Sequence, residues 1–311
     1  MTKPIEPKHP RPQGALQKTE TAEIPPVKYG YFKGFDGTKL FYSIEGEGEP
    51  LIFCSGLVCS SLHWTYQIDY FRKNYQCIWF DYRGHQNSEM PSDLKTLTIE
   101  NIAKDLGILM DELNIKEATL LGHSMGVNVV LEAYKQRPES VKSMVLISGT
   151  AHRPLEQIFG MNLLGPTFNL LKRLYKTSPS LVRKIWKAQG GNPLVKFFVR
   201  LGGFNPHLSS KEDITRYVEQ IDAMDPGILF FLVDEYNQYD AASWLHLIHV
   251  PTLLVSGARD HIIPPKQQEL LAQLIPGSRL ETVLHGSHCP QMDLPELVNI
   301  QIENFLKKSK C

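Results

Sequence analysis

Short apolar runs alternate with amphipathic segments along most of the chain, and this alternation predicts β-strands separated by helices. Two alternating segments, 28–34 and 39–44, flank Asp36-Gly37 and predict an opening hairpin. Buried-strand patterns then recur, and we expect strands near 51–55, 77–81, 117–121, 143–148, 251–256 and 279–284. The order predicts an α/β fold with a mostly parallel sheet covered by helices on both faces.

The helical patterns fall into two groups. One helix is predicted from Ile99 to Leu113, where apolar residues recur every three or four positions and Thr98 is a suitable N-cap. Between Gly149 and about Ser243 only helical signals remain. These are the N-cap and proline pairs Ser178-Pro179, Asn192-Pro193 and Asp225-Pro226, and a capping box formed by Ser209 and Glu212. We therefore expect a helical insertion, 151–242, in a core made of 28–150 and 243–311.

The run Gly122-His123-Ser124-Met125-Gly126 joins a predicted strand to a predicted helix. A serine on such a sharp turn projects its hydroxyl away from the backbone, toward a base and a substrate. Strand and helix come so close there that the residues two before and two after the serine cannot carry bulk, and both are glycine. This context predicts that Ser124 is a nucleophile; the alternative is a chance pentapeptide in a loop.

A serine hydroxyl needs a general base, and the base needs an orienting acid. Asp260 comes just after the predicted strand 251–256, and His288 follows the predicted strand 279–284. Taken singly, an aspartate there is more often a helix cap and a histidine is more often structural. Their joint occurrence after strands, in the order Ser124, Asp260, His288, indicates a catalytic triad. His123 and His285 are the nearest alternative bases, and we expect His123 to pack beside its strand.

These motifs resemble those of the α/β-hydrolase superfamily, in the branch with a helical cap, over about residues 28–311. Asp81-Tyr82-Arg83-Gly84 with Ser88 resembles the family's turn after the fourth strand, with Gln86 where a second glycine is usual. Asp260 to Pro264 resembles its acid loop, and Gly286-Ser287-His288 with Pro295-Glu296 resembles its histidine loop. The resemblance implies that the insertion after the sixth strand is a cap that covers the site and selects the substrate.

The resemblance also implies an oxyanion hole made of two backbone N–H groups, which an acyl-transfer site needs. One belongs to Met125, directly after the nucleophile, and the other to Leu57 in the loop after the third strand. Ser55 stands where the family usually has a histidine, so we expect this loop to be supported differently. This chemistry needs no metal or organic cofactor.

Composition narrows the class of protein. A formal net charge of zero implies no polyanionic partner for the whole chain, and no apolar run is long enough to predict a transmembrane helix. Five cysteines without a C-x-x-C pair predict no disulfide framework or metal cluster and favour a reducing, cytoplasmic compartment. Residues 1–27 are rich in proline and lack both apolar periodicity and the apolar core of a signal peptide, so we expect a flexible tail.

The predicted cap has an unusual charge pattern, because residues 157–211 contain no acid. Its cations are Lys172, Arg173, Lys176, Arg183, Lys184, Lys187, Lys196, Arg200 and Lys211. Large apolar residues lie between them, among them Trp186, Phe197 and Phe198. One interpretation is a cap with a solvated basic back; the other is weak contact of the basic cap with an anionic membrane or an anionic substrate. No nucleic-acid-binding module accompanies the charge, so nucleic acid is not an expected partner.

We predict a serine hydrolase that cleaves a small apolar carboxylic ester through an acyl-enzyme. A serine nucleophile argues against the haloalkane dehalogenase and epoxide hydrolase branches, which use aspartate. A C–C bond hydrolase, a lactonase and a cofactor-free haloperoxidase fit the same motifs. A non-catalytic ligand receptor that retains the pocket is the alternative from a different class, and the presence of all three triad residues argues against it.

Overall fold

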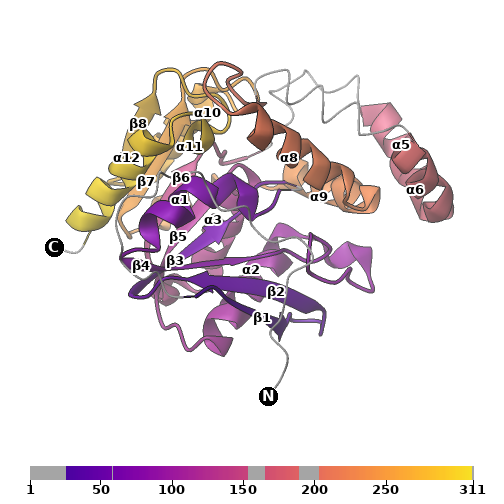
Figure 1. The fold of residues 1–311 in the computed structure, drawn as a ribbon, viewed down its shortest axis with the longest axis horizontal. Helices are drawn as coiled ribbons and strands as arrows, with labels where there is room; N and C mark the ends of the chain where they lie inside the picture. The colour runs from indigo at the N-terminus through magenta and orange to yellow at the C-terminus, as the bar shows by residue number, and fades with distance from the viewer. Residues whose placement is uncertain (1–25, 58, 153–164, 189–202, 310–311) are drawn as a thin grey trace.

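The computed structural model describes residues 26–57, 59–152, 165–188 and 203–309, and an eight-stranded sheet lies at its centre (Figure 1). The strand order is β1-β2-β4-β3-β5-β6-β7-β8. Strands β1 and β2 pair antiparallel, as β2 does with β4, and every other pairing is parallel. The predicted hairpin and the six later strands are confirmed as β1 (Lys28–Lys33), β2 (Lys39–Glu45), β3 (Glu49–Cys54), β4 (Tyr75–Phe80), β5 (Ala118–His123), β6 (Val141–Ile147), β7 (Thr252–Gly257) and β8 (Arg279–Val283).

Helices cover both faces of the sheet, because successive side chains of its buried strands point to opposite sides. In β3, Leu51 and Phe53 join one apolar cluster, whereas Ile52 and Cys54 join the other. The first cluster is closed by α1 (Thr65–Phe71) and α12 (Pro295–Lys308). The second is closed by α2 (Ile99–Glu112), α3 (Met125–Gln136) and α10 (Pro265–Leu274). Short helical turns connect these layers: η1 (Ser61–Trp64), η2 (Leu94–Thr96), η3 (Pro138–Ser140), η5 (Leu245–Leu247) and α11 (Pro290–Asp293).

Within the described ranges, four helices lie between β6 and β7, where the sequence predicts the insertion: α5 (Gly165–Thr177), α6 (Pro179–Ala188), α8 (Lys211–Asp222) and α9 (Pro226–Gln238). Helix α9 packs on the core through Ile228 and Leu232. Helices α5 and α6 pack in turn on α9, and they stand at the end of the molecule farthest from α12 (Figure 1). No helix in the described ranges is long and apolar enough to cross a membrane.

Side-chain hydrogen bonds cap the N-termini of several helices, as the sequence predicts. Thr98 accepts a hydrogen bond from the backbone N–H of Asn101 at 3.1 Å, and Asp225 accepts one from that of Gly227 at 2.9 Å. The predicted capping box at Ser209 is wrong by one residue, because Ser210 caps α8 instead. The Ser209 hydroxyl donates to Asp293 on α11, so a long-range contact takes the place of the local cap. The predicted pair Asn192-Pro193 lies outside the described residues.

Candidate active site

The turn between β5 and α3 holds Ser124 in a left-handed backbone conformation, with φ of +54°. Both flanking glycines are required there. A Cβ on Gly122 would lie 2.5 Å from the carbonyl oxygen of Gly126, and a Cβ on Gly126 would lie 2.2 Å from that of Cys54. Real Cβ contacts are never this short, so a larger residue would displace the backbone of β3 or α3. The close approach inferred from the sequence is therefore present in the structure.

Three loops that follow β5, β7 and β8 bring the predicted triad residues together. His288 Nε2 lies 3.0 Å from Ser124 Oγ, and His288 Nδ1 lies 2.9 Å from Asp260 Oδ2. All three side chains are buried. The other carboxylate oxygen of Asp260 accepts hydrogen bonds from the backbone N–H groups of Ile262 and Ile263, at 2.9 and 2.8 Å. Those two bonds fix the carboxylate, and it in turn orients the imidazole toward the serine.

The loop after β3 passes directly over the serine. A Cβ on Gly56 would lie 3.2 Å from the Cβ of Ser124, so Leu57, the next residue, is close to the nucleophile. Met125 begins α3, and the N–H groups of a helix's first turn have no partner within the helix. Leu57 therefore follows a residue that contacts Ser124, and Met125 follows Ser124 itself.

Ser55 supports the loop after β3 through hydrogen bonds. Its hydroxyl donates to the carbonyl of Ser60 at 3.2 Å, and its own carbonyl accepts from the Tyr82 hydroxyl at 3.0 Å. The Ser60 side chain is hydrogen-bonded to Gln220 on α8. The loop that carries Leu57 is therefore tied both to the core and to the insertion.

His123 does not reach the serine hydroxyl. Its Nε2 lies 2.9 Å from the backbone carbonyl of His288, so the ring holds the main chain of the histidine loop. Burial and the nearby His288 and His63 hold the pKa of His123 well below its usual value, which keeps the ring neutral. The other alternative base, His285, is exposed, and its backbone carbonyl accepts a hydrogen bond from Asn205.

The turn after β4 is a structural support. The Arg83 guanidinium forms a buried two-pronged pair with Asp105, at 2.7 to 2.9 Å, and also binds Asp36 at 2.8 Å. Gln86 has a φ of +38°, so it adopts the left-handed conformation that glycine would favour. Asp81 accepts two hydrogen bonds from Asn87, and burial nevertheless raises the pKa of Asp81 to about 7.

Aromatic side chains of the insertion pack close to the triad. Phe204 and Tyr217 pack against Cys289, the residue after His288, and Tyr217 also lies over the ring of His63. From α9, Tyr236 is 3% exposed. Burial raises the pKa of the Tyr236 phenol, the Ser124 hydroxyl lowers it, and Asp260 raises it, so the phenol lies near the triad. Its oxygen nevertheless has no hydrogen-bond partner within the described residues.

Asp293 fastens the histidine loop to the insertion. One carboxylate oxygen accepts from the backbone N–H of Ser287 at 2.6 Å. The other accepts from the N–H of Asn205 at 3.0 Å and from the Ser209 hydroxyl at 2.5 Å. The sequence motifs single out neither Asp293 nor Tyr236. Tyr236 shows only as one apolar position in a helical pattern, and Asp293 lies between two recognisable segments of the histidine loop.

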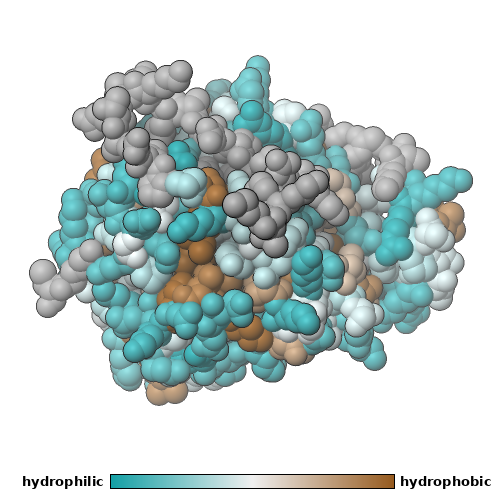
Figure 2. Space-filling view, turned by 60° about the horizontal axis from the view of Figure 1, so that its bottom comes forward, coloured by the Kyte–Doolittle hydropathy of each residue, from teal (hydrophilic) through white to brown (hydrophobic). Residues whose placement is uncertain are grey.

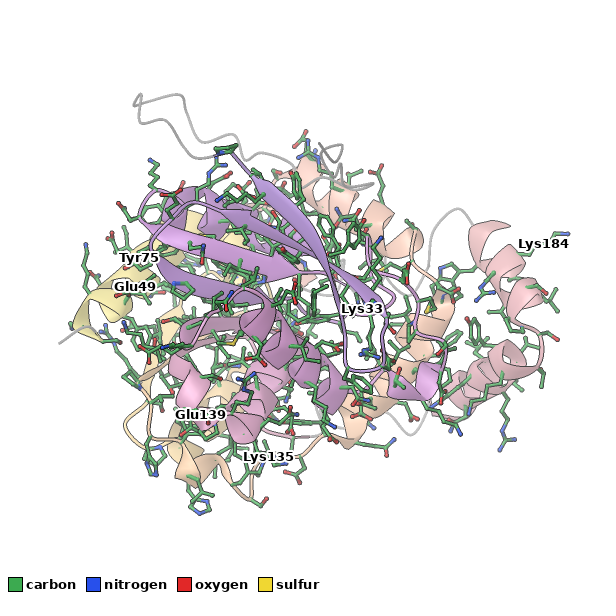
Figure 3. All side chains as sticks on the ribbon, turned by 90° about the horizontal axis from the view of Figure 1, so that it is seen from below. Lys33, Glu49, Tyr75, Lys135, Glu139 and Lys184 are labelled. Atoms are coloured by element: carbon green, nitrogen blue, oxygen red, sulfur yellow. The ribbon has the colours of Figure 1, made fainter. Side chains whose placement is uncertain are left out.

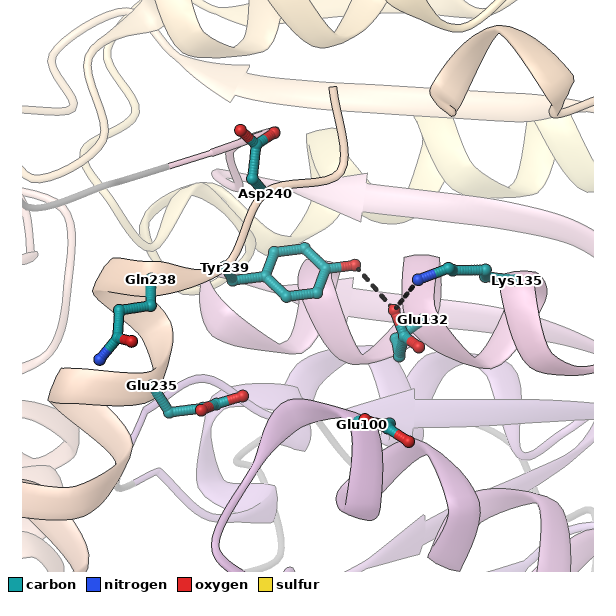
Figure 4. A pocket seen from close by; sticks show the side chains of 7 residues that line it. All are labelled: Glu100, Glu132, Lys135, Glu235, Gln238, Tyr239 and Asp240. Carbon is teal, nitrogen blue, oxygen red and sulfur yellow. Dashed lines mark hydrogen bonds and ion pairs between the residues drawn. The ribbon is translucent and has the colours of Figure 1, made fainter. Parts of the chain in front are cut away.

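A separate hollow of about 260 Å³ lies where α9 meets α2 and α3 (Figure 4). Its lining is rich in carboxylates and contains no triad residue: Glu100, Glu132, Lys135, Glu235, Gln238, Tyr239 and Asp240. Glu132 accepts from the Tyr239 hydroxyl at 3.4 Å and pairs with Lys135 at 3.6 Å. Within the described ranges, no cluster of histidine, cysteine and acidic side chains is arranged to hold a metal ion. We interpret this hollow as the seam between the insertion and the core.

Some cations of the acid-free segment, residues 157–211, are paired with acids elsewhere in the chain. Lys172 pairs with Asp234, and Arg183 pairs with Asp225 at 2.5 Å, so acids of α9 neutralise cations that the local sequence leaves unpaired. Trp186 packs inward, with its ring edge-on against Phe230 and the two ring centroids 6.1 Å apart. Lys196, Phe197, Phe198 and Arg200 lie outside the described residues.

Comparison with known proteins agrees with this architecture. A family model described as the alpha/beta hydrolase fold matches residues 49–295. A putative carbamate hydrolase, RutD, from Azorhizobium caulinodans is 26% identical over 270 residues, which cover 86% of this chain and 94% of RutD.

Two solved structures show the same fold. A thermophilic esterase from Thermogutta terrifontis superposes with a TM-score of 0.76 at 20% identity, over 91% of this chain and 99% of the esterase. An enol-lactonase from Burkholderia xenovorans superposes with a TM-score of 0.74 at 22% identity, over 89% of this chain and all of the lactonase.

Proposed function

This chain belongs to the alpha/beta hydrolase family, and from that premise we propose that it is a serine hydrolase that cleaves esters of apolar carboxylic acids. One observation carries the proposal: Ser124 Oγ, the His288 imidazole and the Asp260 carboxylate form a continuous chain with contacts of 3.0 and 2.9 Å. This is the arrangement that lets a base remove the serine proton as the oxygen attacks.

The reaction then runs in two halves. Ser124 Oγ attacks the ester carbonyl carbon while His288 Nε2 takes the hydroxyl proton, and Asp260 stabilises the resulting imidazolium. The backbone N–H groups of Met125 and Leu57 bind the oxyanion. Collapse of the tetrahedral intermediate breaks the bond to the alkoxy oxygen, which leaves as an alcohol with the proton from His288. Water, deprotonated by His288, then attacks the acyl-enzyme and releases the carboxylic acid and free Ser124.

An apolar acyl group is supported by the surroundings of the triad. The insertion side chains packed against Cys289, the residue after His288, are aromatic or aliphatic: Phe204, Tyr217 and Ile214. The neighbouring His63 is buried and neutral, because burial and the nearby His288 lower its pKa to about 3. A charged acyl chain would lose its hydration there without gaining a counter-charge from these groups.

Tyr236 supplies the polar contact that such a site needs to orient an ester. Its buried hydroxyl has no partner among the described residues, and an unpaired buried donor is costly. We assign this hydroxyl as a hydrogen-bond donor to an ester oxygen of the bound substrate, which would complete the phenol's pairing from the cap side. Tyr236 is then a substrate-binding residue, while Ser124, His288 and Asp260 carry out the chemistry.

A chain-length series of p-nitrophenyl esters, from acetate to decanoate, tests the function. We expect repeated turnover, with kcat/KM rising from acetate until the acyl chain fills the site. A fluorophosphonate should label Ser124 and leave the Ser124→Ala variant unlabelled. One turnover that leaves the protein modified would point instead to a ligand receptor. Turnover confined to lactones or to vinylogous diketones would replace the ester assignment while keeping the triad.

A further inference from the structure

Helices α5 and α6 form a pair with two different faces. The inner face carries Tyr175, Val182 and Trp186, which pack against Phe230 and Phe231 of α9. The solvent-exposed surface of the pair carries four large aliphatic side chains: Leu170 is 65% exposed, Leu171 38%, Leu181 48% and Ile185 45%. Single exposed leucines are ordinary, but four on two adjacent short helices form an apolar surface without a partner in the described structure.

Unpaired cations share this outer surface. The Lys176 ammonium lies over the Phe231 ring of α9, 5.5 Å from its centroid, but Arg173 and Lys184 are exposed and no acid within the described ranges pairs with them. This distinguishes them from Lys172 and Arg183, which α9 neutralises. The Lys184 side chain points away from the body of the protein (Figure 3). At this end of the molecule, hydrophilic and hydrophobic side chains are interleaved on the surface (Figure 2).

We propose that the exposed surface of α5 and α6, formed by Leu170, Leu171, Leu181, Ile185, Arg173 and Lys184, binds the surface of an anionic lipid bilayer. Aliphatic side chains beside lysine and arginine, on helices without an acid, are typical of interfacial segments. The aliphatic groups enter the boundary between headgroups and acyl chains, while the cations pair with lipid phosphates and carboxylates. The proposal does not depend on the reaction at Ser124.

Charge argues for a bilayer over two other occupants. In a symmetric dimer this face would meet its own copy and bring like charges together, which opposes association. The chain's own first 25 residues contain both lysine or arginine and glutamate in similar numbers, so they offer no anionic surface to match. An anionic bilayer provides both an apolar layer and a negative potential.

Co-sedimentation of the full chain with large unilamellar vesicles tests the proposal. We expect binding to vesicles of phosphatidylcholine mixed with phosphatidylserine to exceed binding to phosphatidylcholine alone, and to weaken as salt is raised. The double variant Arg173→Gln/Lys184→Gln should lower partitioning into the mixed vesicles by about 30-fold, since each cation near such a surface contributes about 1 kcal/mol. Leu170→Gln/Leu181→Gln should also lower it, even at low salt.

The matched control, Lys73→Gln/Lys308→Gln, removes two exposed lysines that lie outside the insertion. Lys308 ends α12, at the opposite end of the molecule (Figure 1), and this variant should bind within about twofold of the wild type. Unchanged thermal unfolding midpoints would show that each variant is folded. Equal binding to both vesicle types, no binding to either, or wild-type binding by Arg173→Gln/Lys184→Gln would overturn the proposal. Self-association without vesicles that Leu170→Gln/Leu181→Gln abolishes would assign the face to a second copy instead.

Discussion

The loops around Ser124 and the helical insertion above them are held in place by different kinds of interaction. The loops are fixed by short-range geometry: glycines that permit backbone contact, and hydrogen bonds from backbone N–H groups to Asp260. The insertion is held by side chains from distant segments, such as Arg183 with Asp225 and Ser209 with Asp293. The difference teaches that local sequence largely fixes the backbone around Ser124 and Asp260, whereas the insertion is positioned by contacts between segments far apart in the sequence.

The largest effect is expected from the nucleophile itself. Ser124→Ala should lower kcat toward a p-nitrophenyl ester by about 10⁴- to 10⁶-fold, because the triad acts as a unit, while the far-ultraviolet circular dichroism stays unchanged. His288→Ala should cause a loss of the same order. His123→Ala should cost less, since His123 holds only the backbone carbonyl of His288. The reverse ranking of the two histidine variants would show that the base has been misassigned.

The second largest effect is expected in the free energy of unfolding at acid pH, because buried histidines lie in the core around the nucleophile. Burial lowers the pKa of His63 to about 3, of His85 to about 4, and that of His123 well below its usual value. Below pH 6.5 the unfolded chain takes up protons at these rings while the folded chain does not. These three rings should therefore lower the free energy of unfolding as pH drops, by about 1.4 kcal/mol per pH unit for each ring between pH 6 and 4. Asp81 and Asp105, whose pKa values burial raises to about 7 and about 6, act in the opposite direction.

Urea unfolding at several pH values measures that slope. His63→Phe should reduce it by one ring's share, because both ring nitrogens of His63 lack hydrogen-bond partners within the described residues. His246→Phe, at an exposed histidine, is the matched control and should leave the slope unchanged. An unchanged slope in His63→Phe would mean that this ring is already accessible to protons in the folded state.

The cap-side contact should have a smaller effect than the triad. Tyr236→Phe removes one neutral hydrogen bond to the ester, so kcat/KM should fall about fivefold to tenfold, equivalent to about 1 to 1.4 kcal/mol. Tyr239→Phe removes a phenol from the same segment whose hydroxyl faces Glu132, and it should leave the kinetics unchanged. Equal kinetics for Tyr236→Phe and the wild type would remove Tyr236 from the substrate contacts.

The smallest effect is expected from the N-terminal tail, which belongs to neither region. Deleting residues 2–24 should change kcat/KM by less than about threefold, or under roughly 0.7 kcal/mol, because this proline-rich segment has few apolar groups to bury. Steady-state kinetics of the truncated and full-length chains make the comparison. A loss well above threefold would show that the tail takes part in covering the site.

The strands of the sheet, and the placement of Ser124, Asp260 and His288 directly after three of them, could be predicted because each feature depends on neighbouring residues in the sequence. Alternating apolar residues define the strands, and a glycine on each side of Ser124 defines the turn. The contacts of the insertion could not be predicted in this way. Asp225 and Asp234 lie outside the acid-free segment whose cations they neutralise. A periodic pattern places Tyr236 on a helix but does not say that its hydroxyl faces Ser124, which is 112 positions away in the sequence.

Asp293 has a thermodynamic consequence. One carboxylate binds the backbone of Ser287, beside the triad histidine, and also Asn205 and Ser209 of the insertion. A movement of the insertion that breaks the second set of contacts changes the free energy of the first, so the position of His288 and the position of the insertion are linked equilibria. By reciprocity, if a ligand bound to one arrangement of the insertion changes the preference of His288 between two positions by some factor, the position of His288 changes the affinity for that ligand by the same factor.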